Sequence, residues 1–146
     1  MKFDDIIRAK VNAVSHENLL VRTDTSLAFT LPWPPSVNTY WRSIMGPCHS
    51  RVILSERGRR YRKAVSDQVL LQGVPRHKFR GRLEISVLAN PPDKRKRDLD
   101  NLWKGVLDGL QHSGVVVDDS HFDRMTIERG EVVEGGKLQI TIGERT

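Results

Sequence analysis

The chain has 146 residues, a length typical of one domain with its own hydrophobic core. Its hydrophobic fraction of 38% and mean hydropathy of -0.46, with no apolar run of about 18 residues, fit a soluble globular protein and exclude a membrane-spanning helix. A formal net charge of +6 favours a polyanionic partner, while the single cysteine, Cys48, excludes an intrachain disulfide and a thiolate zinc site.

The first part of the chain predicts an N-terminal extension, residues 1–26, followed by a strand. Apolar side chains at nearly helical spacing predict a short amphipathic helix over residues 3–14 of this extension. Two early acids and the lack of an apolar segment argue against a secretory signal, so we expect a cytoplasmic protein. Residues 27–31 predict a strand that the proline-rich segment 32–35 ends, and a long loop follows to about residue 54.

Two helices and three further strands are predicted in the rest of the chain. Ser55 is a typical N-cap for a first helix over residues 57–71. Apolar residues at alternating positions predict a half-buried strand over residues 83–87, which the proline pair at 91–92 ends.

A second helix is predicted over residues 99–111, with Asp98 as its N-cap. Alternating apolar residues then predict strands around 125–127 and 138–142, and the glycine pair at 135–136 predicts a hairpin turn between them. The resulting β-α-β-α-β-β order indicates the α+β class, with two main helices packed on one mixed sheet.

Basic residues are concentrated in the middle of the chain. Residues 41–104 contain sixteen Lys and Arg against six Asp and Glu, whereas residues 105–146 contain four against eight. This asymmetry indicates that the middle of the chain binds a polyanion such as a nucleic acid. The side chains that we expect to contact phosphates are Arg42, Arg59, Arg62, Lys94, Arg95, Lys96 and Arg97.

Four cations lead directly into two carboxylates spaced one residue apart. The segment is Lys94-Arg95-Lys96-Arg97-Asp98-Leu99-Asp100-Asn101. Cations bind phosphates, whereas clustered carboxylates repel phosphates unless a divalent metal ion lies between them. Both features side by side are what metal-dependent cleavage of a nucleic-acid backbone requires. The alternative interpretation is an exposed charge run followed by an aspartate helix cap.

The acids and one lysine of this region suit a metal site. Asp98 and Asp100 offer the hard oxygen ligands that Mg²⁺ or Mn²⁺ prefers. Lys104, four residues beyond Asp100, either binds the scissile phosphate or forms an ordinary helical ion pair with Asp100. Asp118 and Asp119 suit a turn equally well, and spacing alone does not decide which of them could supply a third carboxylate.

Three aromatic residues, Trp33, Tyr40 and Trp41, lie near the expected end of the first strand. Their rings either stack on nucleic-acid bases or seal an edge of the core. Because tryptophans near a strand end usually belong to the core, we interpret these residues as structural.

Taken in order, the motifs resemble the RusA family of Holliday junction resolvases, which are phage and prophage endonucleases. The resemblance covers roughly residues 27–143. It rests on Leu31-Pro32-Trp33-Pro34-Pro35-Ser36 with Asn38 and Tyr40, on Ser55-Glu56-Gly58-Tyr61-Arg62, on Arg97-Asp98-Leu99-Asp100-Asn101-Leu102 with Lys104, on Asp118-Asp119, and on Gly135-Gly136-Lys137-Leu138.

This resemblance implies a site, a reaction and an assembly. In the family, three aspartates bind a divalent metal and a helix lysine is required for cleavage; the matching residues here are Asp98, Asp100, Asp119 and Lys104. The resemblance thus selects Asp119 over Asp118. It also implies a homodimer that uses Mg²⁺, with Mn²⁺ as a substitute, to resolve four-way DNA junctions by paired symmetric nicks. The endonuclease domain would be residues 27–146, acting in a bacterial host cytoplasm without a membrane or small-molecule partner.

Other classes of protein explain the sequence less completely. A non-catalytic junction- or DNA-binding protein accounts for the basic middle but not for the acids beside it. A nuclease of restriction-enzyme type is suggested by Pro92-Asp93, but no Asp/Glu-x-Lys tripeptide follows. An RNA-binding module would need an aromatic-rich strand, and aromatic residues make up only 6% of the chain.

Overall fold

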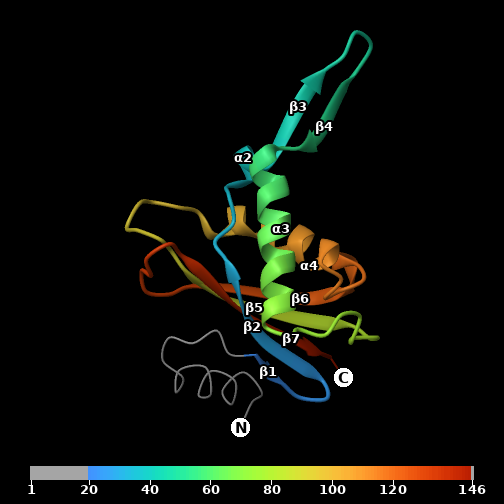
Figure 1. Ribbon diagram of the computed structural model, residues 1–146, viewed down its shortest axis with the longest axis vertical. Coiled ribbons are helices and arrows are strands. Elements are labelled where there is room, and N and C mark those ends of the chain that lie inside the picture. Colours follow the sequence, from blue (N-terminus) through green and yellow to red (C-terminus); the bar gives the residue numbers. More distant parts are fainter. Residues whose placement is uncertain (1–19, 146) are drawn as a thin grey trace.

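The computed structural model describes residues 20–145, so the helix predicted over residues 3–14 lies outside them. Figure 1 shows a mixed sheet with helices packed on it and a two-stranded ribbon that projects from the body. The predicted α+β class is therefore confirmed. Within the described part of the chain, no helix is long and apolar enough to cross a bilayer.

The main sheet has five strands in the order β1-β2-β7-β5-β6. β5 and β6 are parallel, and all the other neighbouring strands are antiparallel. The strands are β1 (Val21–Arg22), β2 (Ser26–Pro32), β5 (Leu83–Asn90), β6 (Phe122–Arg129) and β7 (Lys137–Glu144). β6 is therefore an edge strand, and no strand among residues 20–145 pairs with its outer side.

The predicted hairpin between the last two strands is wrong, because β5 lies between β6 and β7. The glycines at 135–136 do make a turn, with φ angles of 78° and 72°. Before that turn the chain passes the end of β5, where the Gly130 N–H donates to the Ala89 carbonyl at 2.8 Å. Alternating apolar residues specify the two faces of a strand but not its neighbours, so the pattern alone gave the wrong partner.

The long loop predicted before the first helix is also wrong. It contains the short helix α2 (Val37–Tyr40) and the strands β3 (Trp41–Met45) and β4 (Ser50–Leu54), which among residues 20–145 pair only with each other. The sequence does contain a hairpin signal here, a glycine-proline turn between two short runs with β-branched residues. The three prolines at 32–35 pointed instead to irregular structure.

The first main helix, α3 (Glu56–Leu71), lies where it was predicted. Its N-cap is Ser55, whose Oγ accepts a hydrogen bond from the Gly58 N–H at 3.0 Å. At its end, the Gln72 side chain bonds to both backbone groups of Thr30, with the Thr30 N–H donating at 3.0 Å and the Thr30 carbonyl accepting at 2.8 Å. α3 is thereby fixed to the edge of β2.

The second helix begins with a tighter turn than predicted. η1 (Leu99–Leu102) is a 3₁₀ turn that leads into α4 (Trp103–His112). Asp98 occupies the N-cap position, but its side chain makes no capping hydrogen bond. Gly114 ends the helix with a φ of 80°, in the left-handed region that favours glycine. A further 3₁₀ turn, η2 (Asp119–His121), precedes β6.

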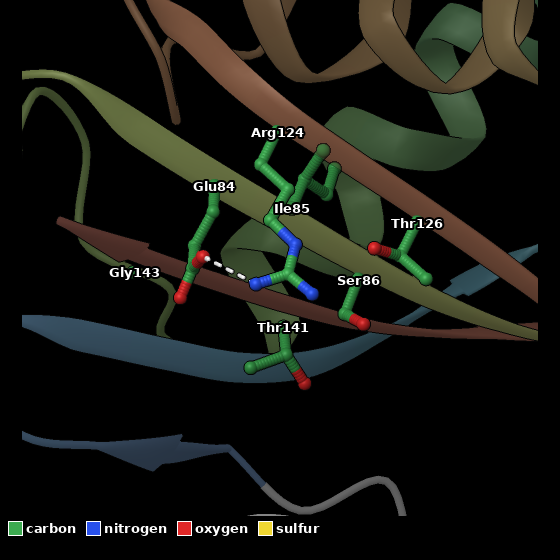
Figure 2. Close-up of a pocket in the computed structure, with 7 residues that line it drawn as sticks. All are labelled: Glu84, Ile85, Ser86, Arg124, Thr126, Thr141 and Gly143. Atoms are coloured by element: carbon green, nitrogen blue, oxygen red, sulfur yellow. Dashed lines mark ion pairs between the residues drawn. The ribbon is translucent and has the colours of Figure 1, made fainter. Parts of the chain in front are cut away.

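The sheet has an apolar face under the helices and a polar opposite face. The core-facing side chains of β5 are Leu83, Ile85 and Val87, all nearly fully buried. Figure 2 shows a shallow depression whose lining includes the hydroxyl side chains of Ser86, Thr126 and Thr141. Arg124 reaches Glu84 there at 4.0 Å. This depression contains none of the predicted site residues, so the site lies elsewhere.

Candidate active site

Asp98 and Asp100 lie where the loop after β5 meets η1. Asp98 has extended backbone just before the turn, and Asp100 is in its first turn. Leu99 and Leu102 pack into the core and anchor this turn. Both carboxylates are exposed, and within residues 20–145 neither makes an ion pair or a side-chain hydrogen bond. Such a donor set fits Mg²⁺, which takes one or two carboxylates and keeps several water ligands.

The basic loop before these acids is shaped by Asp93. Its carboxylate accepts bonds from Arg97 Nη1 at 2.5 Å and Nη2 at 3.0 Å, and from the Arg95 N–H at 2.9 Å. These bonds lower the pKa of Asp93 to about 2. The Arg97 guanidinium also lies 5.9 Å from the centre of the Trp33 ring. Arg97 therefore has a structural role that the sequence did not reveal.

The other three cations of the loop remain available for phosphates. Lys94, Arg95 and Lys96 are exposed, and only Arg95 has an ion pair among the described residues, a loose one of 3.7 Å with Asp93. Lys104 is exposed in the first turn of α4. The ion pair with Asp100, one of the two alternatives for Lys104, does not form in the described part of the chain. The ammonium group is thus free to meet a phosphate.

Asp118 and Asp119 have different environments. The Asp118 carboxylate accepts a hydrogen bond from the Ser120 N–H at 2.8 Å and so caps η2. Hydrogen bonds with Ser120 lower the pKa of Asp118 below its usual value. Asp119 is exposed at the start of η2 and caps nothing there. Asp118 therefore has the turn role, which leaves Asp119 as the better candidate for a ligand.

The structure separates Asp119 from the other two aspartates within one chain. Asp119 stands just before Phe122, at the start of β6. Arg129 lies at the opposite end of β6. Its Nη2 donates a hydrogen bond of 2.7 Å to the carbonyl of Arg97, the residue before Asp98. The eight residues of β6 put these ends about 23 Å apart along the strand. Accordingly, residues 20–145 contain no group of three or more acidic, His or Cys side chains placed to hold a metal ion.

Arg62, predicted to contact phosphates, instead forms part of a partly buried network. Its Nε and Nη2 donate to the two carboxylate oxygens of Asp108 in α4, at 2.7 and 2.8 Å. The hydroxyl of Tyr40, which is fully buried, donates to the same carboxylate. Burial acts to raise the pKa of Asp108, but the bonds from Arg62 and Tyr40 outweigh it and lower the pKa. The network joins α2, α3 and α4, and it was not predicted from the sequence.

The remaining predicted contacts lie near the ribbon. Arg42 is exposed on β3. Arg59 is exposed in α3, where its Nη1 donates to the Leu54 carbonyl at 2.9 Å. Trp33 and Trp41 are partly buried and pack against the core, and Tyr40 is buried, so the structural interpretation of the aromatic residues is confirmed.

Comparisons with known proteins give one consistent family. The family model described as endodeoxyribonuclease RusA matches residues 32–143. A crossover junction endodeoxyribonuclease rusA from Enterobacteria phage HK97 is 46% identical over 116 residues, which are 80% of this chain and 92% of that protein. The proteins of that name from Escherichia coli strain K12 and Enterobacteria phage 82 are 34% and 35% identical, over 80% and 79% of this chain and 93% and 92% of their own lengths.

Proposed function

The chain belongs to the RusA family of endodeoxyribonucleases, and from this premise we propose that it is a Mg²⁺-dependent, structure-selective endonuclease that resolves four-way DNA junctions by paired symmetric nicks. The observation that carries the proposal is the pair of exposed, unpaired carboxylates, Asp98 and Asp100, directly after an exposed basic loop. Because the relatives come from Escherichia coli and from enterobacterial phages, we place the activity in the bacterial cytoplasm.

Each group of the site has a distinct task in this proposal. Mg²⁺, or Mn²⁺ in its place, would be held by the aspartates, would lower the pKa of a bound water and would stabilise charge on the phosphate. Asp98 and Asp100 would hold that ion from a turn that Leu99 anchors in the core. Lys104 presents an unpaired ammonium one helical turn away, where it stabilises negative charge on the scissile phosphate. Lys94 and its basic neighbours bind the flanking backbone.

The position of Asp119 supports a site shared between two chains. One chain separates Asp119 from Asp98 by about the length of β6, so all three aspartates cannot serve one metal ion within that chain. β6 is an edge strand, and Met125 near its middle is 41% exposed. If two copies of β6 pair antiparallel about a two-fold axis, each Asp119 lies beside the Asp98 and Asp100 of the other copy. The homodimer then has two identical sites, one for each strand to be cut.

The proposal is tested by incubating the protein with a synthetic four-way junction or a linear duplex of the same sequence, in Mg²⁺ or EDTA. We expect paired symmetric nicks on the junction in Mg²⁺ only. Asp100→Asn should lower the cleavage rate by at least about 100-fold while junction binding persists. Asp67→Asn, which alters an exposed carboxylate paired with Lys63 on α3, is the matched control and should cleave normally. Cleavage in EDTA would refute the metal mechanism, and tight binding without cleavage in any metal would leave a non-catalytic junction-binding protein.

A further inference from the structure

The β3–β4 hairpin, residues 41–54 and called the ribbon below, is not needed by the mechanism. Figure 1 shows it projecting from the end of the molecule opposite β1, away from the sheet. Two of its apolar side chains are strongly exposed, Met45 at 85% and Val52 at 66%. A two-stranded hairpin alone is only marginally stable in water, and exposed apolar groups gathered on one element mark a contact surface.

The charges of the ribbon select the kind of partner. Residues 25–55 contain no Asp or Glu, whereas the ribbon carries Arg42 and Arg51, both exposed. The strand register sets Arg42 opposite Ile53 and Ile44 opposite Arg51, so both guanidinium groups share one face. A purely cationic surface with apolar groups between the charges complements nucleic acid better than it complements a protein surface.

The other face of the ribbon has a different chemistry. Because side chains alternate along a strand, Met45 and Val52 share this face with Ser43 and Ser50. It carries no charge, and at the ribbon tip it ends with Met45, the most exposed large hydrophobic side chain of the described residues. Apolar wedges of this kind, methionine among them, pack against base steps in proteins that distort DNA.

The root of the ribbon is held rigidly against the body. The Ser55 N–H donates to the Tyr40 carbonyl at 3.0 Å, and the Ser55 Oγ donates to the Thr39 carbonyl at 2.5 Å. A Cβ at Gly58 would lie 2.6 Å from the Tyr40 carbonyl oxygen, so the first turn of α3 touches this root directly. The network around Asp108 holds Tyr40 from the other side. The ribbon is therefore an arm with a fixed direction.

We propose that the ribbon enters the DNA at the branch point of the junction, an inference that rests on the proposed function. A two-stranded ribbon fits a DNA groove, where Arg42 and Arg51 contact phosphates on either side. Met45 then packs against a base pair at the branch point. An open branch point exposes unstacked, apolar base-pair faces in the interior of the DNA, whereas a continuous duplex exposes such faces only at its ends. The ribbon thus contributes to the preference for junctions over duplex.

The test uses a four-way junction with 2-aminopurine at the branch point and a matched duplex, in EDTA so that neither is cut. Arg42→Gln/Arg51→Gln should lower junction affinity by about tenfold at 0.15 M salt. The slope of log affinity against log salt concentration should become shallower by the equivalent of about two phosphate contacts. Met45→Ser should abolish most of the 2-aminopurine signal and weaken junction binding by about tenfold, the effect of losing a buried methionine. The affinity of the Met45→Ser variant for the duplex should be unchanged. Arg22→Gln/Arg80→Gln, with the same charge change far from the ribbon, is the control.

Cys48, which is exposed at the ribbon tip, provides a second readout in the unaltered protein. Its reaction with a maleimide should be slower with junction than with an equal concentration of bound duplex. If the ribbon variants match the control while the wild type still cleaves junctions, the ribbon proposal fails and the proposed function stands. If the ribbon variants turn a dimer into a monomer, the ribbon binds a second copy of the chain and the ribbon proposal is wrong. A wild type that neither binds nor cleaves junctions would overturn both.

Discussion

Substitution of Asp108 by Ala should be among the most destabilising single changes outside the apolar core. The carboxylate accepts three hydrogen bonds, two from Arg62 and one from Tyr40. Its side chain is only 19% exposed, and that of Arg62 is 30% exposed. The change would leave a guanidinium without its counter-ion and a buried hydroxyl without its acceptor.

The size of the effect follows from the burial of each partner. Hydrogen bonds to a charged group contribute about 1.5–3 kcal/mol each, but three bonds that share one carboxylate do not add fully. The guanidinium can turn partly toward water, whereas the Tyr40 hydroxyl cannot. We therefore expect the free energy of unfolding to fall by about 3 kcal/mol, which lowers Tm by roughly 6–12 °C for a chain of this size.

Urea and thermal unfolding of the wild type, Asp108→Ala and Asp67→Ala measure this difference. Asp67 is the matched control, because it too is a helical carboxylate in an ion pair, but its side chain is 54% exposed and should contribute less than about 0.5 kcal/mol. The pKa of Asp108 is lowered in the folded state, so its contribution is complete above about pH 4 and is lost as the pH falls further. Equal losses for the two variants at pH 7 would refute the reasoning.

Two further predictions concern the ribbon root and the basic loop. Gly58→Ala places a methyl group 2.6 Å from the Tyr40 carbonyl oxygen and should cost about 1–3 kcal/mol in a urea titration, whereas Gly81→Ala, which meets nothing within 4 Å, should be neutral. The pKa of Asp93 is about 2, so its bonds to the loop are intact above about pH 4 and are lost as the pH falls toward 2. Asp93→Asn should shift the indole NMR signal of Trp33 at pH 7, and an unshifted signal would contradict a loop held by that carboxylate.

The sequence predicted best those features that depend on neighbouring residues. The N-cap of α3 at Ser55 and the extent of that helix depend on local spacing and backbone conformation, and both are confirmed. The alternation that marked β5 and β7 is local in the same sense. Elements with a clear period were therefore found close to their true ends.

What the sequence missed depends on contacts between distant residues. Arg62 looked like a free cation because its partner, Asp108, is 46 residues away. The same reason explains the wrong neighbour for β7, since no residue in an alternating strand identifies the strand beside it. Asp100 and Asp119 are only 19 positions apart in the sequence, so the sequence does not show that β6 lies between them in the fold. This separation is the reason for proposing that a second chain completes the site.

The most direct test of a junction-cutting site shared between two chains is a mixing experiment with two inactive variants. Asp100→Asn and Asp119→Asn are co-expressed with different tags, and the mixed dimer is purified and given a four-way junction in Mg²⁺. A shared site predicts that one of the two sites regains Asp98, Asp100 and Asp119 together, so the mixed dimer nicks one strand of the junction while each parent dimer cuts neither. If the mixed dimer stays inactive while the wild type makes paired nicks, the aspartates act within one chain and the shared site is wrong.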